Sequence, residues 1–90
     1  MYLHLGQDTV VRMRDVIGIF DLDTATISRA TRNYLARATR EGEVINVTYD
    51  LPKSFVVCID QEKKRRVYIS QISSATLLKR AGYIEDISNV

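Results

Sequence analysis

Hydrophobic and polar positions along the chain follow the spacing of β-strands in six short stretches and the spacing of α-helices in two. The expected strands, in chain order, are 2–5, 9–14, 16–20, 44–49, 54–59 and 66–69. The expected helices run from about residue 25 to 40 and from about residue 73 or 74 to 80. The stretch 16–20 is an almost continuous apolar run, which is typical of a strand buried on both faces.

Residues suited to helix ends support both helices. Asp23 or Thr24 can accept hydrogen bonds from the first free backbone N–H groups of the earlier helix, and Gly42 suits a left-handed stop after it. Ser73 or Ser74 can cap the later helix in the same way. The sequence therefore predicts clear boundaries for both helices.

The element order β-β-β-α-β-β-β-α indicates a small single α+β domain with a mixed or mainly antiparallel sheet. We expect this domain to span residues 1–82, followed by a C-terminal tail, residues 83–90, of helical, extended or loose conformation.

Composition narrows the class of protein. The chain has 90 residues, of which 46% are hydrophobic and 27% are charged, so wholesale disorder is excluded. A chain of this size buries only about 60–65% of its unfolded surface, which favours self-association. No apolar run approaches the length of a membrane helix, and the first residues do not resemble a signal peptide. We therefore expect a cytoplasmic protein with no membrane partner.

Catalytic and metal chemistry have little support. A single cysteine cannot form a disulfide scaffold or a usual structural zinc site, and Cys58 lies in an apolar run that predicts a buried, unreactive thiol. The single histidine, His4, has no acid, base or nucleophile pattern around it. We expect neither an enzyme nor a cofactor-binding protein.

The basic residues are more informative than the net charge of +2. Four arginines, Arg29, Arg32, Arg37 and Arg40, share the arc of the first helix that lies opposite its apolar face. No acidic residue occurs from 24 to 40, and arginine binds phosphate oxygens in bidentate fashion. This arc is either a phosphate-binding face or a merely solvated one, paired with Glu41, Glu43 or another subunit.

Two further basic groups occur. One is the hairpin-tip run Lys63, Lys64, Arg65 and Arg66, which either grips nucleic acid or keeps the tip soluble. The other consists of Arg12, Arg14 and Lys53, which fall at strand ends where loops of one sheet edge can converge. Together the groups favour a nucleic-acid partner.

Aromatic residues on or beside strands leave two interpretations open. They are Tyr2, Tyr49, Phe55 and Tyr68. A sheet that presents rings to unpaired bases is one interpretation, and core or interface packing is the other. Packing is favoured because Ser54-Phe55-Val56-Val57 lacks the basic-Gly-aromatic signature of RNA-recognition motifs.

Several stretches resemble the RemA-like family of bacterial extracellular matrix regulatory proteins. They are Met1-Tyr2-Leu3-His4-Leu5-Gly6, Ile17-Gly18-Ile19-Phe20-Asp21-Leu22, Asp50-Leu51-Pro52-Lys53-Ser54-Phe55-Val56-Val57-Cys58, Val67-Tyr68-Ile69-Ser70 and Ile72-Ser73-Ser74-Ala75-Thr76-Leu77-Leu78-Lys79-Arg80. The resemblance covers residues 1 to about 80. It implies a cytoplasmic DNA-binding activator of matrix-production operons that assembles into closed rings, with double-stranded DNA following the basic surface of the ring.

The chain departs from this family at the loop after the strand 44–49. RemA-type chains carry consecutive arginines there, whereas this loop is Asp50-Leu51-Pro52-Lys53, and Asp15 stands where those chains have another arginine. We therefore expect phosphate contacts from Arg12, Arg14 and Lys53, extended by the helix arginines and the hairpin-tip run. The alternative is an oligomeric protein-interaction module that binds no DNA, for example as the partner of a RemA-type paralogue in a mixed assembly.

Overall fold

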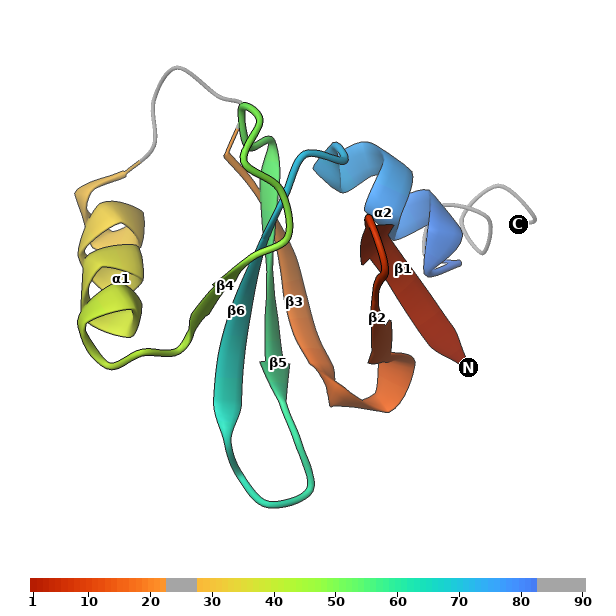
Figure 1. Cartoon of the computed structure of the whole chain (residues 1–90), viewed down its shortest axis with the longest axis horizontal. Coiled ribbons are helices and arrows are strands. Elements are labelled where there is room, and N and C mark those ends of the chain that lie inside the picture. The colour runs from red at the N-terminus through yellow and green to blue at the C-terminus, as the bar shows by residue number, and fades with distance from the viewer. Residues whose placement is uncertain (23–27, 83–90) are drawn as a thin grey trace.

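The computed structural model describes residues 1–22 and 28–82, and its elements follow the predicted order (Figure 1). They are β1 (Tyr2–Gly6), β2 (Thr9–Arg12), the short 3₁₀ turn η1 (Met13–Asp15), β3 (Val16–Asp21), α1 (Arg29–Arg40), β4 (Val44–Asn46), β5 (Ser54–Ile59), β6 (Arg65–Ser70) and α2 (Ser74–Arg80). The predicted α+β class is confirmed. The expected tail, residues 83–90, lies outside the described residues.

The strands form two sheets. β1 and β2 make an antiparallel hairpin, and the other four form a sheet in the order β3-β5-β6-β4. β5 is antiparallel to both of its neighbours, whereas β4 is parallel to β6, so this sheet is mixed. Its two edges are β3 and β4, whose outer backbone groups have no strand partner in the described structure.

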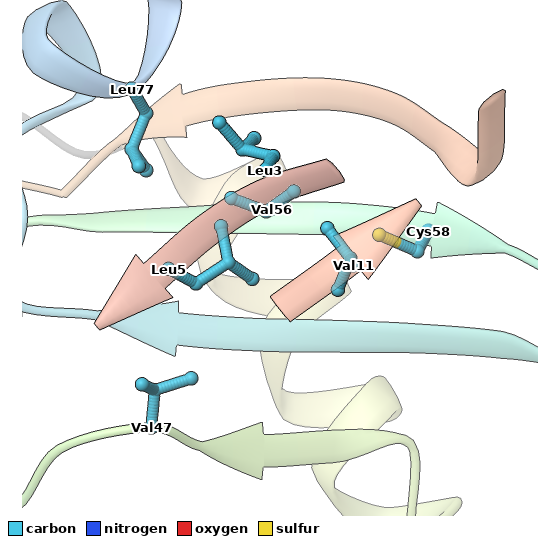
Figure 2. Close-up of a cluster of buried hydrophobic side chains, with 7 residues drawn as sticks. All are labelled: Leu3, Leu5, Val11, Val47, Val56, Cys58 and Leu77. Atoms are coloured by element: carbon cyan, nitrogen blue, oxygen red, sulfur yellow. The ribbon is translucent and has the colours of Figure 1, made fainter. Parts of the chain in front are cut away.

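The core lies in two layers on opposite faces of β5. Val56 and Cys58 point toward the β1–β2 hairpin and α2, and they pack in a buried cluster (Figure 2). The other members of this cluster are Leu3, Leu5, Val11, Val47 and Leu77. Phe55 and Val57 point the other way and pack against Val67 of β6 and Ala38 of α1. Side chains alternate along a strand, so one continuous apolar run supplies both layers.

The prediction that residues 16–20 are buried on both faces is wrong. β3 is an edge strand, and Ile17 and Phe20 are 63% and 45% exposed on the face that α1 occupies. The strand buried on both faces is β5, which lies between β3 and β6. An apolar run fits both positions, and only the order of strands in the sheet distinguishes them.

The first helix begins later than predicted. Ser28 is extended and its Oγ accepts a hydrogen bond from the Thr31 N–H at 3.1 Å, so α1 starts at Arg29 rather than near Ala25. The cap candidates Asp23 and Thr24 lie outside the described residues.

Other predicted ends are confirmed or shortened. Gly42 has a φ of +72° just after α1, as predicted, and Ser73 caps α2. The expected strand 9–14 ends at Arg12 because η1 follows, and the expected strand 44–49 ends at Asn46. Within residues 1–22 and 28–82, no helix is long and apolar enough to cross a membrane.

Candidate nucleic-acid interface

The exposed face of α1 carries four arginines. Arg29, Arg32, Arg37 and Arg40 are all exposed, and α1 covers the sheet with the opposite side, where Ala38 is buried. Among the described residues, no carboxylate lies within ion-pair distance of any of the four. The alternative in which this face pairs with Glu41 or Glu43 therefore finds no support among the described residues.

Two of these arginines occupy positions that the helix itself disfavours. Arg29 and Arg32 lie in the first turn of α1, which contains no acidic residue. The amino end of a helix carries partial positive charge, so bases there lower helix stability, whereas Arg37 and Arg40 suit the carboxyl end. Basic residues that lower the stability of their own helix are expected where a ligand binds to their positive charge.

A hollow continues along the same helix face. It measures about 440 Å³ and is lined by Ala30, Asn33, Tyr34, Arg37 and Arg40. The Arg37 guanidinium lies over the Tyr34 ring, 5.9 Å from its centre. The hollow offers a guanidinium and an amide side chain to an anionic ligand.

The structure brings Arg12 together with part of the hairpin-tip run. Arg12 lies at the end of β2, and it lines a hollow of about 160 Å³ with Lys64 and Arg66. Two carboxylates, Asp15 and Asp60, line the same hollow. Arg12 also lines a larger hollow of about 460 Å³ with Arg14 and the first residues of the chain. Arg12, Arg14 and Lys64 therefore form a second basic region at one end of the β3–β5 pair.

Lys53 does not join Arg12 and Arg14. It precedes Ser54, which pairs with Asp21, while Arg14 lies next to the opposite end of β3, where Val16 pairs with Cys58. The six-residue strands between them span roughly 17–20 Å. The expected convergence of the three bases is therefore wrong within one chain, because β3 runs antiparallel to β5.

The hairpin-tip run divides into paired and unpaired bases. The Arg65 Nε lies 3.3 Å from a Glu43 carboxylate oxygen, and an Arg66 guanidinium nitrogen lies 2.9 Å from Asp60. Backbone N–H donation from Lys64, together with Arg66 and the Glu62 N–H, lowers the pKa of Asp60. Lys63 and Lys64 remain exposed and without an ion-pair partner among the described residues. Arg66 therefore pairs within the β5–β6 hairpin, whereas Arg65 pairs with Glu43, which directly precedes β4.

Two titratable groups, Cys58 and Tyr68, line the smaller of the two hollows in this region. The predicted burial of Cys58 is confirmed, and this burial, with Asp15 nearby, raises the pKa of its thiol to about 11. Burial likewise raises the pKa of Tyr68. In the described part of the chain, no group of three histidine, cysteine or acidic side chains is placed to hold a metal.

Sequence reasoning missed an apolar groove beside the basic helix. It measures about 360 Å³, and its walls come from β3 and α1 over a floor from β5. The lining residues are Ile17, Phe20, Ala30, Thr31, Tyr34, Phe55 and Val57. The sequence pattern places the stretch 16–20 in the core, so it does not predict that Phe20 lines an exposed groove. The missing signal was the strand order, which leaves β3 at an edge.

Comparison with known proteins agrees with the resemblance found in the sequence. Residues 2–81 match the model of a RemA-like family, described as extracellular matrix regulatory protein A-like. The chain is also 37% identical over 89 residues to extracellular matrix regulatory protein B of Bacillus subtilis (strain 168), an alignment that covers 99% of this chain and 100% of that protein.

Proposed function

The chain belongs to the RemA-like family of extracellular matrix regulatory proteins, and from this premise we propose that it is a DNA-binding regulator of transcription. It acts in the cytoplasm on genes of the extracellular matrix, without catalysis or a cofactor. It binds the phosphate backbone of double-stranded DNA as a ring-shaped homo-oligomer.

The observation that carries the proposal is the arginine face of α1. Four exposed guanidinium groups lie on one helix without a described carboxylate partner, and two of them oppose the helix dipole. Arginine suits phosphate because its planar group can donate two parallel hydrogen bonds. Arg12, Arg14, Lys53, Lys63 and Lys64 add exposed positive charge elsewhere on the chain.

Repetition in an oligomer supplies the affinity that one copy lacks. A net charge of +2 is small, and the basic groups of one chain lie on different sides of the sheet. When copies are joined, each further contact with the same duplex becomes intramolecular, and the binding strength multiplies. Lys53, which stands apart from Arg12 and Arg14 in one copy, contributes to the array in this way.

The second candidate function is a protein-interaction module that binds no DNA and partners a RemA-type paralogue. The loop between β4 and β5 favours it, because Tyr49 and Leu51 are exposed there. Exposed apolar side chains in a loop indicate a protein contact more than a phosphate contact. Mixing the two proteins and measuring the mass distribution tests this function, and two unmixed species would contradict it.

The test of DNA binding removes charge from the amino end of α1. Arg29→Gln with Arg32→Gln should weaken binding to duplex DNA about 10-fold or more at low salt, because two phosphate contacts are lost. The slope of log affinity against log salt should become shallower by roughly 1 to 2. Fluorescence anisotropy with a labelled duplex measures both quantities.

The matched control removes two bases from the other helix. Lys79→Gln with Arg80→Gln changes the net charge equally, and both residues are exposed in the last turn of α2. The affinity of this variant should stay within about 2-fold of wild type. Equal losses in the two variants would show a response to net charge alone and would remove α1 from the site.

A further inference from the structure

The groove between α1 and β3 is apolar and has a preformed shape. Its floor is formed by Phe55, on which the Phe20 ring stacks with 4.9 Å between the ring centres. Gly18 leaves room for this ring, since a Cβ at that position would lie 2.6 Å from two ring atoms of Phe20. The groove is therefore shaped before anything binds to it, which lowers the entropic cost of binding.

The chain also carries an exposed apolar projection. Tyr49 and Leu51, in the loop between β4 and β5, are 98% and 78% exposed. The loop is held at both ends, because Thr48 Oγ1 accepts from the Asp50 N–H at 3.1 Å, and Lys53 donates its N–H to the Ser70 carbonyl at 2.8 Å. Two large apolar side chains are thus presented to solvent on a fixed backbone.

We propose that the Tyr49–Leu51 loop of one copy inserts into the groove between α1 and β3 of a second copy. The two surfaces match in kind, since one is an apolar hollow and the other a pair of projecting apolar side chains. Within one chain the loop does not fill the groove, because Tyr49 and Ile17 are both exposed.

Charge complementarity supports this occupant. Asp50 stands between the two apolar side chains of the loop, and Tyr34 of the groove also lines the hollow that contains Arg37 and Arg40. A loop seated in the groove therefore brings a carboxylate toward Arg37 and Arg40, which line the adjoining hollow, and not toward Arg29 and Arg32. The outer faces of the β1–β2 hairpin match less well, because Arg12 accompanies its exposed Tyr2 and Val10.

Such a contact joins two different surfaces, and so each copy can both receive a loop and offer one. Repetition of a contact of this kind closes into a ring or extends into a filament, whereas a contact between identical surfaces stops at a dimer. The inference rests on the proposed homo-oligomer and names the surfaces that form it.

Two variants test the surfaces separately by analytical ultracentrifugation in the absence of DNA. Ile17→Lys places a charge in the groove, and Tyr49→Ala with Leu51→Ala removes the projection. All three residues are exposed, so the fold should persist in both variants. Each variant alone should sediment as a monomer at concentrations about 100-fold above those at which wild type associates. Val10→Lys is the control, because Val10 is 54% exposed on a different strand, and it should associate like wild type.

Mixing the two variants gives the decisive measurement. The Ile17→Lys chain retains an intact loop and the Tyr49→Ala, Leu51→Ala chain retains an intact groove, so an equimolar mixture should form 1:1 dimers and nothing larger. A mixture that stays monomeric would overturn the proposal. Normal association of either variant alone would also overturn it. A loop that binds a paralogue and supports no self-association would overturn it as well.

The outcomes distinguish this inference from the proposed function. A wild-type chain that remains monomeric at all concentrations contradicts both the homo-oligomer and the contact. A wild-type oligomer that neither substitution disturbs contradicts the contact alone. Because mass is the only readout, a failure of the chain to bind DNA leaves the interpretation of this experiment unchanged.

Discussion

Individual residues were predicted best where one side chain decides the local structure. Ser73 was expected as one of two caps for the second helix, and Gly42 as a left-handed stop, because few residue types suit these backbone positions. Ser28 was missed because other polar residues upstream also suit an N-cap. Sequence alone thus defines the type of end more securely than its position.

Cys58 provides a prediction that depends on pH. Its thiol has a pKa of about 11 in the folded chain, above its ordinary value of 9.0. The unfolded thiol therefore loses its proton first as the pH rises, so folding stability is lost between about pH 9 and 11. Cys58→Val removes this contribution and keeps an apolar side chain at a buried position.

Urea unfolding of wild type and Cys58→Val at pH 8 and pH 10 measures the effect. Wild type should lose about 1 kcal/mol more than the variant over this interval. Tyr68, whose pKa is also raised, is present in both proteins and contributes to both losses. Parallel losses in the two proteins would contradict a protonated, buried Cys58.

At the scale of elements, α1 combines good packing with an unfavourable charge distribution. Its buried side meets β4, β5 and β6 through a small cluster, while its first turn holds bases and no acid. The sequence predicted both the arc of arginines and the opposite apolar face, since both follow from a spacing of 3.6 residues per turn. It could not predict that the acids nearby lack contact with the arc, because that depends on tertiary placement.

The charge distribution predicts opposite stability changes in the two helices. Arg29→Gln with Arg32→Gln should raise the free energy of unfolding by about 0.5 kcal/mol, because bases leave the positive end of α1. Lys79→Gln with Arg80→Gln should lower it by at least as much, because bases leave the negative end of α2 and the hydrogen bond that Arg80 donates to the His4 carbonyl at 3.3 Å is lost. Urea unfolding at low and high salt measures both, and the differences should shrink at high salt. A loss of stability in the α1 variant would contradict charges placed against the helix dipole.

The N-cap of α1 gives a second prediction at this scale. Ser28→Ala removes the hydrogen bond that the Thr31 N–H donates at 3.1 Å and should cost about 1 kcal/mol of stability. Ser28→Asp is the comparison, because aspartate also caps and its charge suits the amino end. Thermal unfolding should therefore rank the aspartate variant at or above wild type and the alanine variant below it. An alanine variant as stable as wild type would show that the cap contributes nothing.

For the whole molecule, the decisive information is the order of strands. The element order and class follow from sequence patterns, but an apolar run such as 16–20 fits a central strand and an edge strand equally well. The antiparallel pairing of β3 with β5 separates Lys53 from Arg14, and the edge position of β3 exposes Ile17 and Phe20. Candidate bases could thus be named from the sequence, whereas their grouping, and the groove beside them, required the fold.

The whole molecule is proposed to bind DNA through many phosphate contacts, and one salt titration tests this most directly. Binding of wild type to a long labelled duplex is measured by fluorescence anisotropy from low to high salt. Log affinity should fall linearly with log salt, with a slope steeper than about −4, which corresponds to at least four or five phosphates. An absence of binding at the lowest salt, or an affinity that does not change with salt, would contradict a backbone-binding regulator.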